Sequence, residues 1–432
     1  PEVTSIAARL AVSYFPSDIA KPLAGRTFNE WADVSRWLSE LSDPQAVPDQ
    51  AITAKAESLT AGMKTDFERI KAIGAYVQKI HYIAIQTGEG RGGGYRPHPA
   101  TVVFSKSYGD CKDKANLMRT MLKVIGIESF PVSIFSGDPF YVRKEWPSPQ
   151  QFNHCIIAVK VGADTKGPSV IDHPSLGRLL IFDPTDEETP VGEVSEQLQG
   201  SYALIITREG GALVKMPQTP PEENLHVCKV DASLAADGSI GASVEVKDQG
   251  WAATQARAYF HQMPKVDYTK RIERWITRGA NGATVTSIEP ADDADAHRFN
   301  LKVQFNALNY AQLMQGTLLV FKPSVVHNDD IPSLGDKERK YAVVLSPSAY
   351  KDEVKVKLPA GFSVDELPDP VKLETEFGEY STSYQVKDGA LVFSRTLIVR
   401  GGMIPVSKYA PLRAFFGRAY AADESPVVLA KK

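Results

Sequence analysis

A chain of 432 residues is too long for one hydrophobic core, so division into two or three domains is expected. Its 43% hydrophobic and 23% charged residues are those of an ordinary globular protein, and a formal net charge of −3 gives no electrostatic basis for binding nucleic acid or an anionic membrane. No uninterrupted apolar run is long enough to span a bilayer. Three cysteines, without a CxxC pair or a Cys/His cluster at zinc spacing, are too few for a disulfide framework and indicate no zinc site.

The first part of the chain is predicted to be helical after a short lead. Residues 1–26 are expected to form a strand and a loop, a remnant or linker from a domain upstream, and the start at proline rather than methionine indicates a processed or truncated piece. Thr27–Glu30 and Thr65–Glu68 have the pattern of a capping box, each followed by apolar residues at helical spacing. Another helix is expected at about 50–61, and a short strand at 82–86 precedes a glycine-rich loop.

The stretch 107–127 combines a helix with a cysteine at its start. Asp110 is a favourable N-cap, Cys111 falls at the first helical position, and Gly126 ends the helix. A thiol at a helix N-terminus faces unpaired N–H groups and the positive end of the macrodipole, which favour the thiolate. One face of this helix is predicted to be buried, because apolar residues repeat at three- and four-residue spacing: Ala115, Met118, Met121, Leu122 and Ile125.

After this helix the pattern changes to strands, at 130–135, 153–161 and 178–185. Helices followed by strands within one segment favour an α+β domain over a doubly wound βαβ sheet. We expect this domain to occupy residues 27–215.

The remainder, residues 216–432, begins with a proline-rich linker and is predicted to be mostly β. Alternating strands separated by Asp-Gly turns indicate a mostly antiparallel, sandwich-like region. One helical interruption is expected at about 251–278. The region could hold two subdomains, at about 226–345 and 346–432.

Three residues have the chemistry of a cysteine nucleophile and its partners. A nucleophilic Cys111 needs a base to take its proton and a third group to orient that base. His154 begins one predicted strand, and Asp183 ends another and is followed by Pro184. If those strands are neighbours in one sheet, the imidazole and the carboxylate meet beside the helix that begins at Cys111. On the residues alone a structural or solvated histidine and an ordinary Asp-Pro turn remain alternatives.

Other polar residues near these motifs are given structural roles. Cys155 alternates with His154 along its strand and is expected to point to the opposite sheet face as a small buried hydrophobe. Cys228 is interpreted in the same way. His98 has no partner at a useful spacing. Lys112 and Lys114 either stabilise a thiolate or are exposed helix charges.

Several segments together resemble a known family. Three ordered motifs resemble those of the transglutaminase-like superfamily, whose fold is similar to that of papain-like cysteine proteases: YGDCKDKANLM, FNHCIIAV and IFDPTDE. More narrowly, the chain resembles bacterial multidomain proteins with a β-rich domain on each side of a transglutaminase-like core. The similarity runs from about Thr27 onward and includes three further segments: GEGRGGGYRPHPA, LPAGFSVDELP and VSKYAPLRAFF.

The resemblance implies roles for the three residues. Cys111 is the nucleophile, His154 the general base and then acid, and Asp183 the orienting carboxylate. Attack on a carboxamide gives a tetrahedral intermediate and then a thioester acyl-enzyme, with loss of ammonia or an amine. A lysine-type amine then completes transamidation, whereas water completes deamidation or proteolysis.

The oxyanion of the tetrahedral intermediate needs preorganised donors. The backbone N–H of Cys111 is one, and the side chains of Gln86 and Tyr82 are candidates for the second. Cross-linking members of the family often use a tryptophan here, and this chain has none between Trp37 and Trp146.

The leading hypothesis is therefore a transglutaminase-like cysteine enzyme acting on amide bonds of proteins or peptides. One alternative is a cysteine peptidase or amidase that uses water as acceptor; another is a cell-envelope binding or scaffold protein whose core has little turnover. The mechanism needs no metal or organic cofactor. The expected partners are a protein or peptide substrate and a protein bound by the β-rich C-terminal half, and the expected location is the bacterial periplasm or cell envelope.

Overall fold

The computed structural model describes residues 7–10, 12, 28–84, 94–293 and 296–432. The chain divides into two compact units, residues 1–219 and 220–432. Most of the lead expected to form a strand and a loop lies outside the described residues. In the part of the chain described, no helix is long and apolar enough to cross a membrane.

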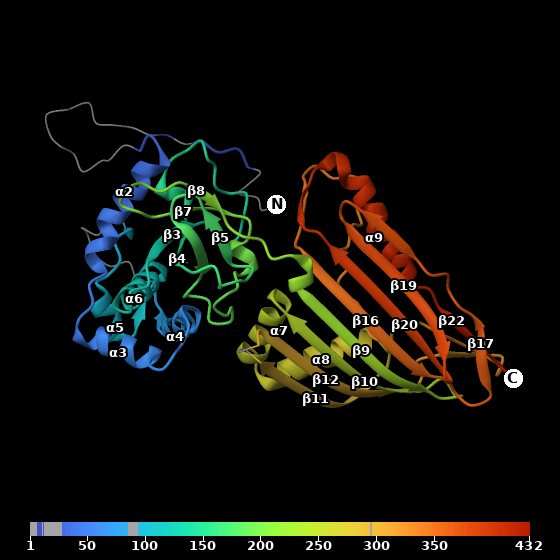
Figure 1. Cartoon of the computed structure of the whole chain (residues 1–432). Coiled ribbons are helices and arrows are strands. Elements are labelled where there is room, and N and C mark those ends of the chain that lie inside the picture. Colours follow the sequence, from blue (N-terminus) through green and yellow to red (C-terminus); the bar gives the residue numbers. More distant parts are fainter. Residues whose placement is uncertain (1–6, 11, 13–27, 85–93, 294–295) are drawn as a thin grey trace. The chain divides into compact units, whose positions relative to one another are not determined.

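The first unit packs helices against an antiparallel sheet (Figure 1). The described strands of this sheet follow the order β5-β6-β4-β3-β7-β8. The helices are α2 Trp31–Ser42, α3 Gln50–Thr60, α4 Asp66–Gln78, α5 Ala100–Lys106 and α6 Cys111–Val124. The strands of the sheet are β3 Ser129–Ile134, β4 His154–Lys160, β5 Val170–His173, β6 Gly177–Phe182, β7 Tyr202–Ile205 and β8 Leu213–Lys215. A separate parallel pair joins β1 His81–Tyr82 to β2 Tyr108–Gly109.

Helix α6 is the centre of this unit and forms as predicted. The Asp110 side chain accepts from the backbone N–H of Asp113, whose own carboxylate accepts from the N–H of Asp110, so the two residues form a capping box. Gly126, just beyond the helix, has φ +77°, a left-handed conformation in which glycine carries no Cβ penalty. The apolar face of α6 is fully buried and packs with side chains from β4 and β6: Leu117, Met118, Met121, Ile157, Val159, Leu180 and Phe182.

The predicted helix starts were right for α4 and displaced for α2. Thr65 caps α4 through a capping box with Glu68, as expected. Helix α2 begins instead at Trp31, with Glu30 as N-cap and Asp33 completing the box. A helix capped by Thr27 would have Glu30 at its third position, and the observed helix capped by Glu30 has Asp33 there. The bond from the N–H of Glu30 to the Asp33 carboxylate favours the later start.

The predicted strands that begin at His154 and end before Asp183 are neighbours. Strands β4 and β6 pair antiparallel, with Ile157 opposite Phe182. Because β4 starts and β6 ends at the same edge of the sheet, His154 and Asp183 emerge side by side there.

The second unit is built on one large sheet. Its described strands follow the order β11-β12-β10-β9-β16-β20-β19-β18, and all neighbours pair antiparallel except β9 and β16. These strands are β9 Leu225–Leu234, β10 Ile240–Gln249, β11 Thr284–Asp293, β12 Arg298–Ala307, β16 Ser348–Lys357, β18 Lys372–Thr375, β19 Gly378–Lys387 and β20 Ala390–Val399. The two segments considered as subdomains thus contribute strands to the same sheet.

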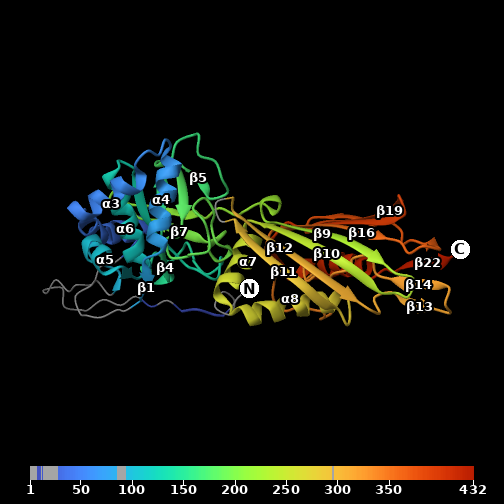
Figure 2. The ribbon, with the colours of Figure 1, turned by 90° about the horizontal axis from the view of Figure 1, so that it is seen from below.

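One face of this sheet is buried, as the sequence alternation predicts. In β9, Cys228, Val230 and Ala232 are buried, whereas Lys229 and Asp231 between them are exposed. Helix α8 and strands of a smaller sheet pack on the buried face (Figure 2). The smaller sheet contains β13 Gln312–Met314, β14 Leu318–Phe321, β17 Phe362–Glu366 and β22 Val427–Lys431, and a separate pair joins β15 Val343–Leu345 to β21 Gly402–Ile404.

Two helical predictions for this unit were wrong. The single helix expected at 251–278 is two helices, α7 Trp251–Gln262 and α8 Lys265–Gly279, because Pro264 lacks an N–H and disfavours helical geometry at the residue before it. Helix α9, Tyr409–Asp423, was not predicted. It covers another part of the sheet's buried face with Leu412, Phe415, Phe416 and Ala419.

Candidate active site

Cys111 occupies the first position of α6 and is only partly buried, so it is accessible. Its backbone N–H has no carbonyl four residues earlier within the helix, and the macrodipole presents its positive end there. The side chains of His154 and Tyr82 lie beside the thiol, and their interactions with Cys111 contribute to raising the pKa of both groups. A thiol, an imidazole and a phenol therefore lie together at one helix end.

His154 bridges the sulfur and a carboxylate. Its Nε2 lies 2.7 Å from Oδ2 of Asp183, which leaves Nδ1 as the ring nitrogen for Cys111. Burial of the ring opposes its charged form, but hydrogen bonds and charge interactions with Asp183 and Cys111 prevail and raise the pKa of His154 to about 10. The imidazolium is therefore the favoured form at neutral pH.

Asp183 is held in place by the next residues of its own turn. The backbone N–H and the hydroxyl of Thr185 donate to Oδ1 of Asp183 at 2.8 and 2.7 Å. Burial of Asp183 favours its neutral form, yet its bonds to His154 and Thr185 outweigh burial and lower the pKa of this carboxyl. With Oδ1 occupied by Thr185, Oδ2 is directed at the imidazole.

Tyr82 lies at the end of β1 with its ring half exposed. Burial of the hydroxyl, the nearby charges of Cys111 and Asp110 and the hydrogen bond to Cys111 raise the pKa of Tyr82 to about 12. The phenol therefore stays protonated and is a hydrogen-bond donor beside the sulfur. Gln86, the other candidate for the second oxyanion donor, lies outside the described residues.

Lys114 is fully buried and does not act as an exposed helix charge. Its Nζ donates to the backbone oxygens of Gln78, at 3.0 Å, and Ile80, at 2.7 Å. Since Ile80 immediately precedes β1, this lysine fixes the start of the strand that ends at Tyr82. Lys112 instead forms an ion pair with Asp110.

Sequence reasoning missed the pairing of His98 with α6. Asp113 accepts from the backbone N–H of His98 at 2.7 Å and lies 2.8 Å from its ring Nδ1. A signal for this pairing was present in the helix itself. The capping box uses one carboxylate oxygen of Asp113, and the other oxygen is available to a donor from another segment. Cys155 is partly buried, and desolvation raises the pKa of its thiol well above the usual value.

No group of three or more His, Cys, Asp or Glu side chains suited to hold a metal ion occurs among the described residues.

A helix that begins at a cysteine, followed by antiparallel strands that present a histidine and an aspartate, defines a cysteine-enzyme fold of the papain and transglutaminase kind. Residues 53–165 match the family model of the transglutaminase-like superfamily, and this segment is a transglutaminase-like domain. Residues 317–429, in the second unit, match a domain of unknown function, DUF3858. No curated protein matches the chain significantly.

Two solved structures are similar to the chain. One, a candidate protease from Parabacteroides distasonis ATCC 8503, is 11% identical with a TM-score of 0.54; the match covers 96% of this chain and 64% of that one. The chain thus spans less than two thirds of that protein, and the likeness is one of fold. The other, a candidate cysteine protease from Cytophaga hutchinsonii, is 12% identical with a TM-score of 0.24, over 40% of this chain and 46% of that one.

Proposed function

We propose that this protein is a cysteine enzyme that attacks carboxamide bonds of proteins or peptides and forms a thioester at Cys111. The observation that carries the proposal is the position of His154, whose ring lies 2.7 Å from Asp183 and also interacts with Cys111 at the start of α6. A purely structural histidine has no need of a partly accessible thiol at a helix N-terminus as its second partner.

The proposed reaction starts from a thiolate and an imidazolium. The sulfur of Cys111 bonds to the carbonyl carbon, and the carbonyl π electrons move to the oxygen. The backbone N–H of Cys111 and the hydroxyl of Tyr82 donate to this oxyanion. Nδ1 of His154 then gives its proton to the leaving nitrogen, the C–N bond breaks, and a thioester remains.

The second half of the reaction reverses these proton movements. Nδ1 of His154, now neutral, takes a proton from the acceptor as the acceptor attacks the thioester carbonyl. The C–S bond breaks, and the thiolate–imidazolium pair is restored. Asp183 stays ionised throughout and stabilises the imidazolium.

Water and an amine are both chemically competent acceptors. Hydrolysis draws support from the Parabacteroides structure of similar fold, which is that of a candidate protease. Transamidation is the reaction suggested by the family name of residues 53–165. The proposal covers both, because they share the thioester.

The test uses the full chain and its Cys111→Ala variant. Each is incubated with iodoacetamide, and separately with a glutamine-containing peptide plus a fluorescent primary amine. We expect rapid alkylation at Cys111 and product formation only where Cys111 is present. Amine incorporation identifies transamidation, whereas peptide cleavage or ammonia release without incorporation identifies hydrolysis.

Cys155→Ala is the matched control, since the raised pKa of its thiol disfavours the thiolate and the thiol takes no part in the proposed reaction. It should alkylate and turn over as the unchanged protein does. If Cys111 alkylates no faster than a free thiol and no peptide turns over, the proposal fails and a binding or scaffold role gains support.

A further inference from the structure

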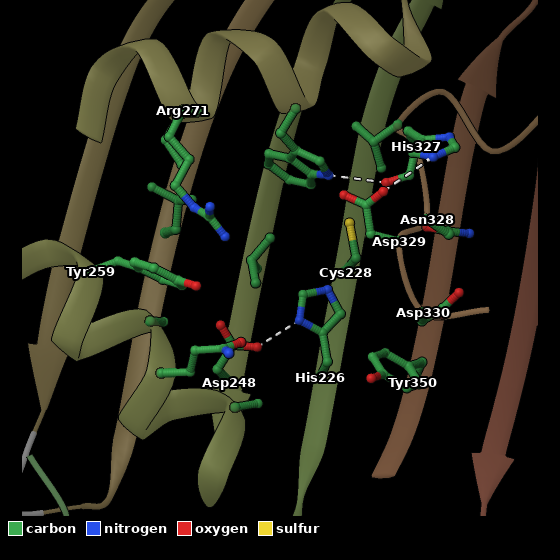
Figure 3. A pocket seen from close by; sticks show the side chains of 18 of the residues that line it. His226, Cys228, Asp248, Tyr259, Arg271, His327, Asn328, Asp329, Asp330 and Tyr350 are labelled. Carbon is green, nitrogen blue, oxygen red and sulfur yellow. Dashed lines mark hydrogen bonds and ion pairs between the residues drawn. The ribbon is translucent and has the colours of Figure 1, made fainter. Parts of the chain in front are cut away.

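The second unit contains a cavity of about 750 Å³ that takes no part in the proposed reaction. Its walls are α7 and α8, the strands β9, β10, β12 and β16, and the loop 326–330 (Figure 3). Every lining residue lies between 224 and 350, so the cavity belongs to this unit alone. Its size is that of pockets that enclose small organic ligands.

Aromatic rings supply much of the wall. They come from both helices and from the sheet: Trp251, Tyr259, Tyr268, Trp275, Phe299 and Tyr350. Trp275 also donates from Nε1 to the backbone oxygen of His327 at 3.0 Å, which fastens the loop to α8. A preformed wall of this kind favours a flat apolar body, because stacked or edge-on rings add to the gain from burial.

The acidic groups of the cavity are each paired. Asp248 lies 2.6 Å from Nδ1 of His226, opposite it on the neighbouring strand. Asp329 forms an ion pair with Arg278. Asp330 binds Arg395. Asp330 shares that guanidinium with Asp352 and Asp423, so negative charge is in excess beside Asp330.

Arg271 is different, because its charge is not neutralised by an acid. Its guanidinium lies 3.9 Å from the centroid of the Tyr259 ring, and among the described residues it has no hydrogen-bond or ion-pair partner. Figure 3 shows its side chain reaching from α8 into the cavity. Arg274 also borders the cavity but shares an outer hollow with Asp267 and Glu273.

We propose that this cavity binds an aromatic carboxylate, whose carboxylate bonds to the guanidinium of Arg271 and whose ring packs among the aromatic side chains. The planar fork of a guanidinium matches a carboxylate with two parallel hydrogen bonds. A monoanion fits better than a phosphate dianion, since Asp248, Asp329 and Asp330 border the same space and repel additional negative charge.

The test titrates N-acetyl-L-phenylalanine into the full chain bearing Cys111→Ala, by calorimetry and by tryptophan fluorescence, since Trp251 and Trp275 line the cavity. N-acetyl-L-phenylalaninamide, which lacks the charge, is the matched probe. We expect saturable binding of the acid and at least tenfold weaker binding of the amide, because a charge-assisted hydrogen bond is lost.

Arg271→Met should weaken binding of the acid about tenfold or more. Lys270→Met, which removes the same charge from the next position of α8 outside the cavity, should leave it within about twofold. Circular dichroism melts of both variants establish that they fold. Ala256→Trp, which fills the cavity, should abolish binding.

The proposal is overturned if the acid fails to saturate the protein at millimolar concentrations. It is equally overturned if acid and amide bind alike, or if Arg271→Met binds as well as Lys270→Met. None of these results bears on Cys111, so the proposed enzymatic function stands or falls separately.

Discussion

At the scale of single residues, the geometry of the candidate site is set by hydrogen bonds that occupy one atom of each polar group and leave the other atom for the next residue. Oδ1 of Asp183 is occupied by Thr185, so Oδ2 faces His154. Nε2 of His154 is thereby occupied, which leaves Nδ1 as the ring nitrogen available to Cys111. Each bond selects the geometry of the next one, and this is the preorganisation that acyl transfer requires.

Thr185→Val tests this selection. The substitution removes the hydroxyl that donates to Asp183 and leaves only the backbone N–H of residue 185 on that oxygen, so the carboxylate is held less firmly and the imidazole is less well oriented. We expect kcat to fall about tenfold with KM nearly unchanged, because about 1.4 kcal/mol of orientation is lost in the transition state only. Steady-state kinetics with the peptide substrate measure both constants. Thr185→Ser keeps the hydroxyl and should restore most of kcat; equal loss in both variants would contradict the role given to the hydroxyl.

The pKa of His154 predicts where activity ends at high pH. Because the folded protein raises that pKa to about 10, the ring holds its proton at neutral pH and loses it only above about pH 10. We therefore expect kcat/KM to stay level through neutral pH and to fall as pH rises through about 10. Tyr82, with its pKa raised to about 12, titrates later. Tyr82→Phe should lower the rate and keep the same limb; a limb that disappears in this variant would assign it to the phenol.

At the scale of elements, α6 links the site to the rest of its unit. Its first residue is Cys111. In its first turn, Asp113 binds the backbone N–H and the ring of His98. Lys114, which follows Asp113, binds the backbone oxygen just before β1. The backbone oxygen of Gln78 is one of the two acceptors of that lysine. The side-chain amide of Gln78 donates to the backbone oxygens of Asp186 and Thr189, just beyond the Asp183 turn. One helix therefore positions three of the segments that form the site.

Lys114→Met should break this connection. The substitution keeps an apolar stem of similar length but leaves the backbone oxygens of Gln78 and Ile80 buried without that donor. We expect the free energy of unfolding to fall by about 2 kcal/mol. Urea denaturation followed by circular dichroism measures the loss. Lys123→Met, at the exposed end of the same helix, is the control and should change stability by less than about 0.5 kcal/mol. Equal stability of the two variants would remove Lys114 from its anchoring role.

The elements that the sequence predicted well are those whose signals are local. The cap and apolar stripe of α6, the box at Thr65 and the alternation in β9 all lie within a few residues. Pro264 was also a local signal, and the continuous helix predicted across it gave too much weight to the apolar residues on both sides. Helix α9 was missed because it has no acidic residue in its first turn and no basic residue in its last turn, and because the sequence around it is predicted to form strands.

At the scale of the whole molecule, pairings between distant residues could not be predicted from the sequence. The buried Arg395 is the clearest case: it bonds Asp330, Asp352 and Asp423, which lie on a loop, on β16 and at the end of α9. Nothing in the local pattern of β20 distinguishes this arginine from a solvent-exposed one. Its burial follows from strand pairing and from the docking of α9, which only the complete fold determines.

This cluster makes the stability of the second unit depend on pH, because three carboxylates share one guanidinium. Burial raises the pKa of Asp352 to about 6, although Arg395 opposes the shift. The folded state therefore binds a proton at Asp352 that the unfolded chain, with an ordinary carboxyl pKa, has released between about pH 4 and 6. The contribution of this residue to the free energy of unfolding is thus larger below pH 4 to 5 and is lost as pH rises through about 6.

Asp352→Asn isolates this effect, since the amide is similar in size and does not titrate. Between pH 7 and pH 5 the unchanged protein should gain about 1 kcal/mol more stability than the variant. His226, whose pKa is raised by its bond to Asp248 against the effect of burial, also interacts with the charge of Asp352, so the comparison measures the two coupled groups together. Urea titrations at the two pH values provide the four free energies. If both proteins change equally with pH, Asp352 stays ionised throughout, and Arg395 compensates the three carboxylates more fully than their burial penalises them.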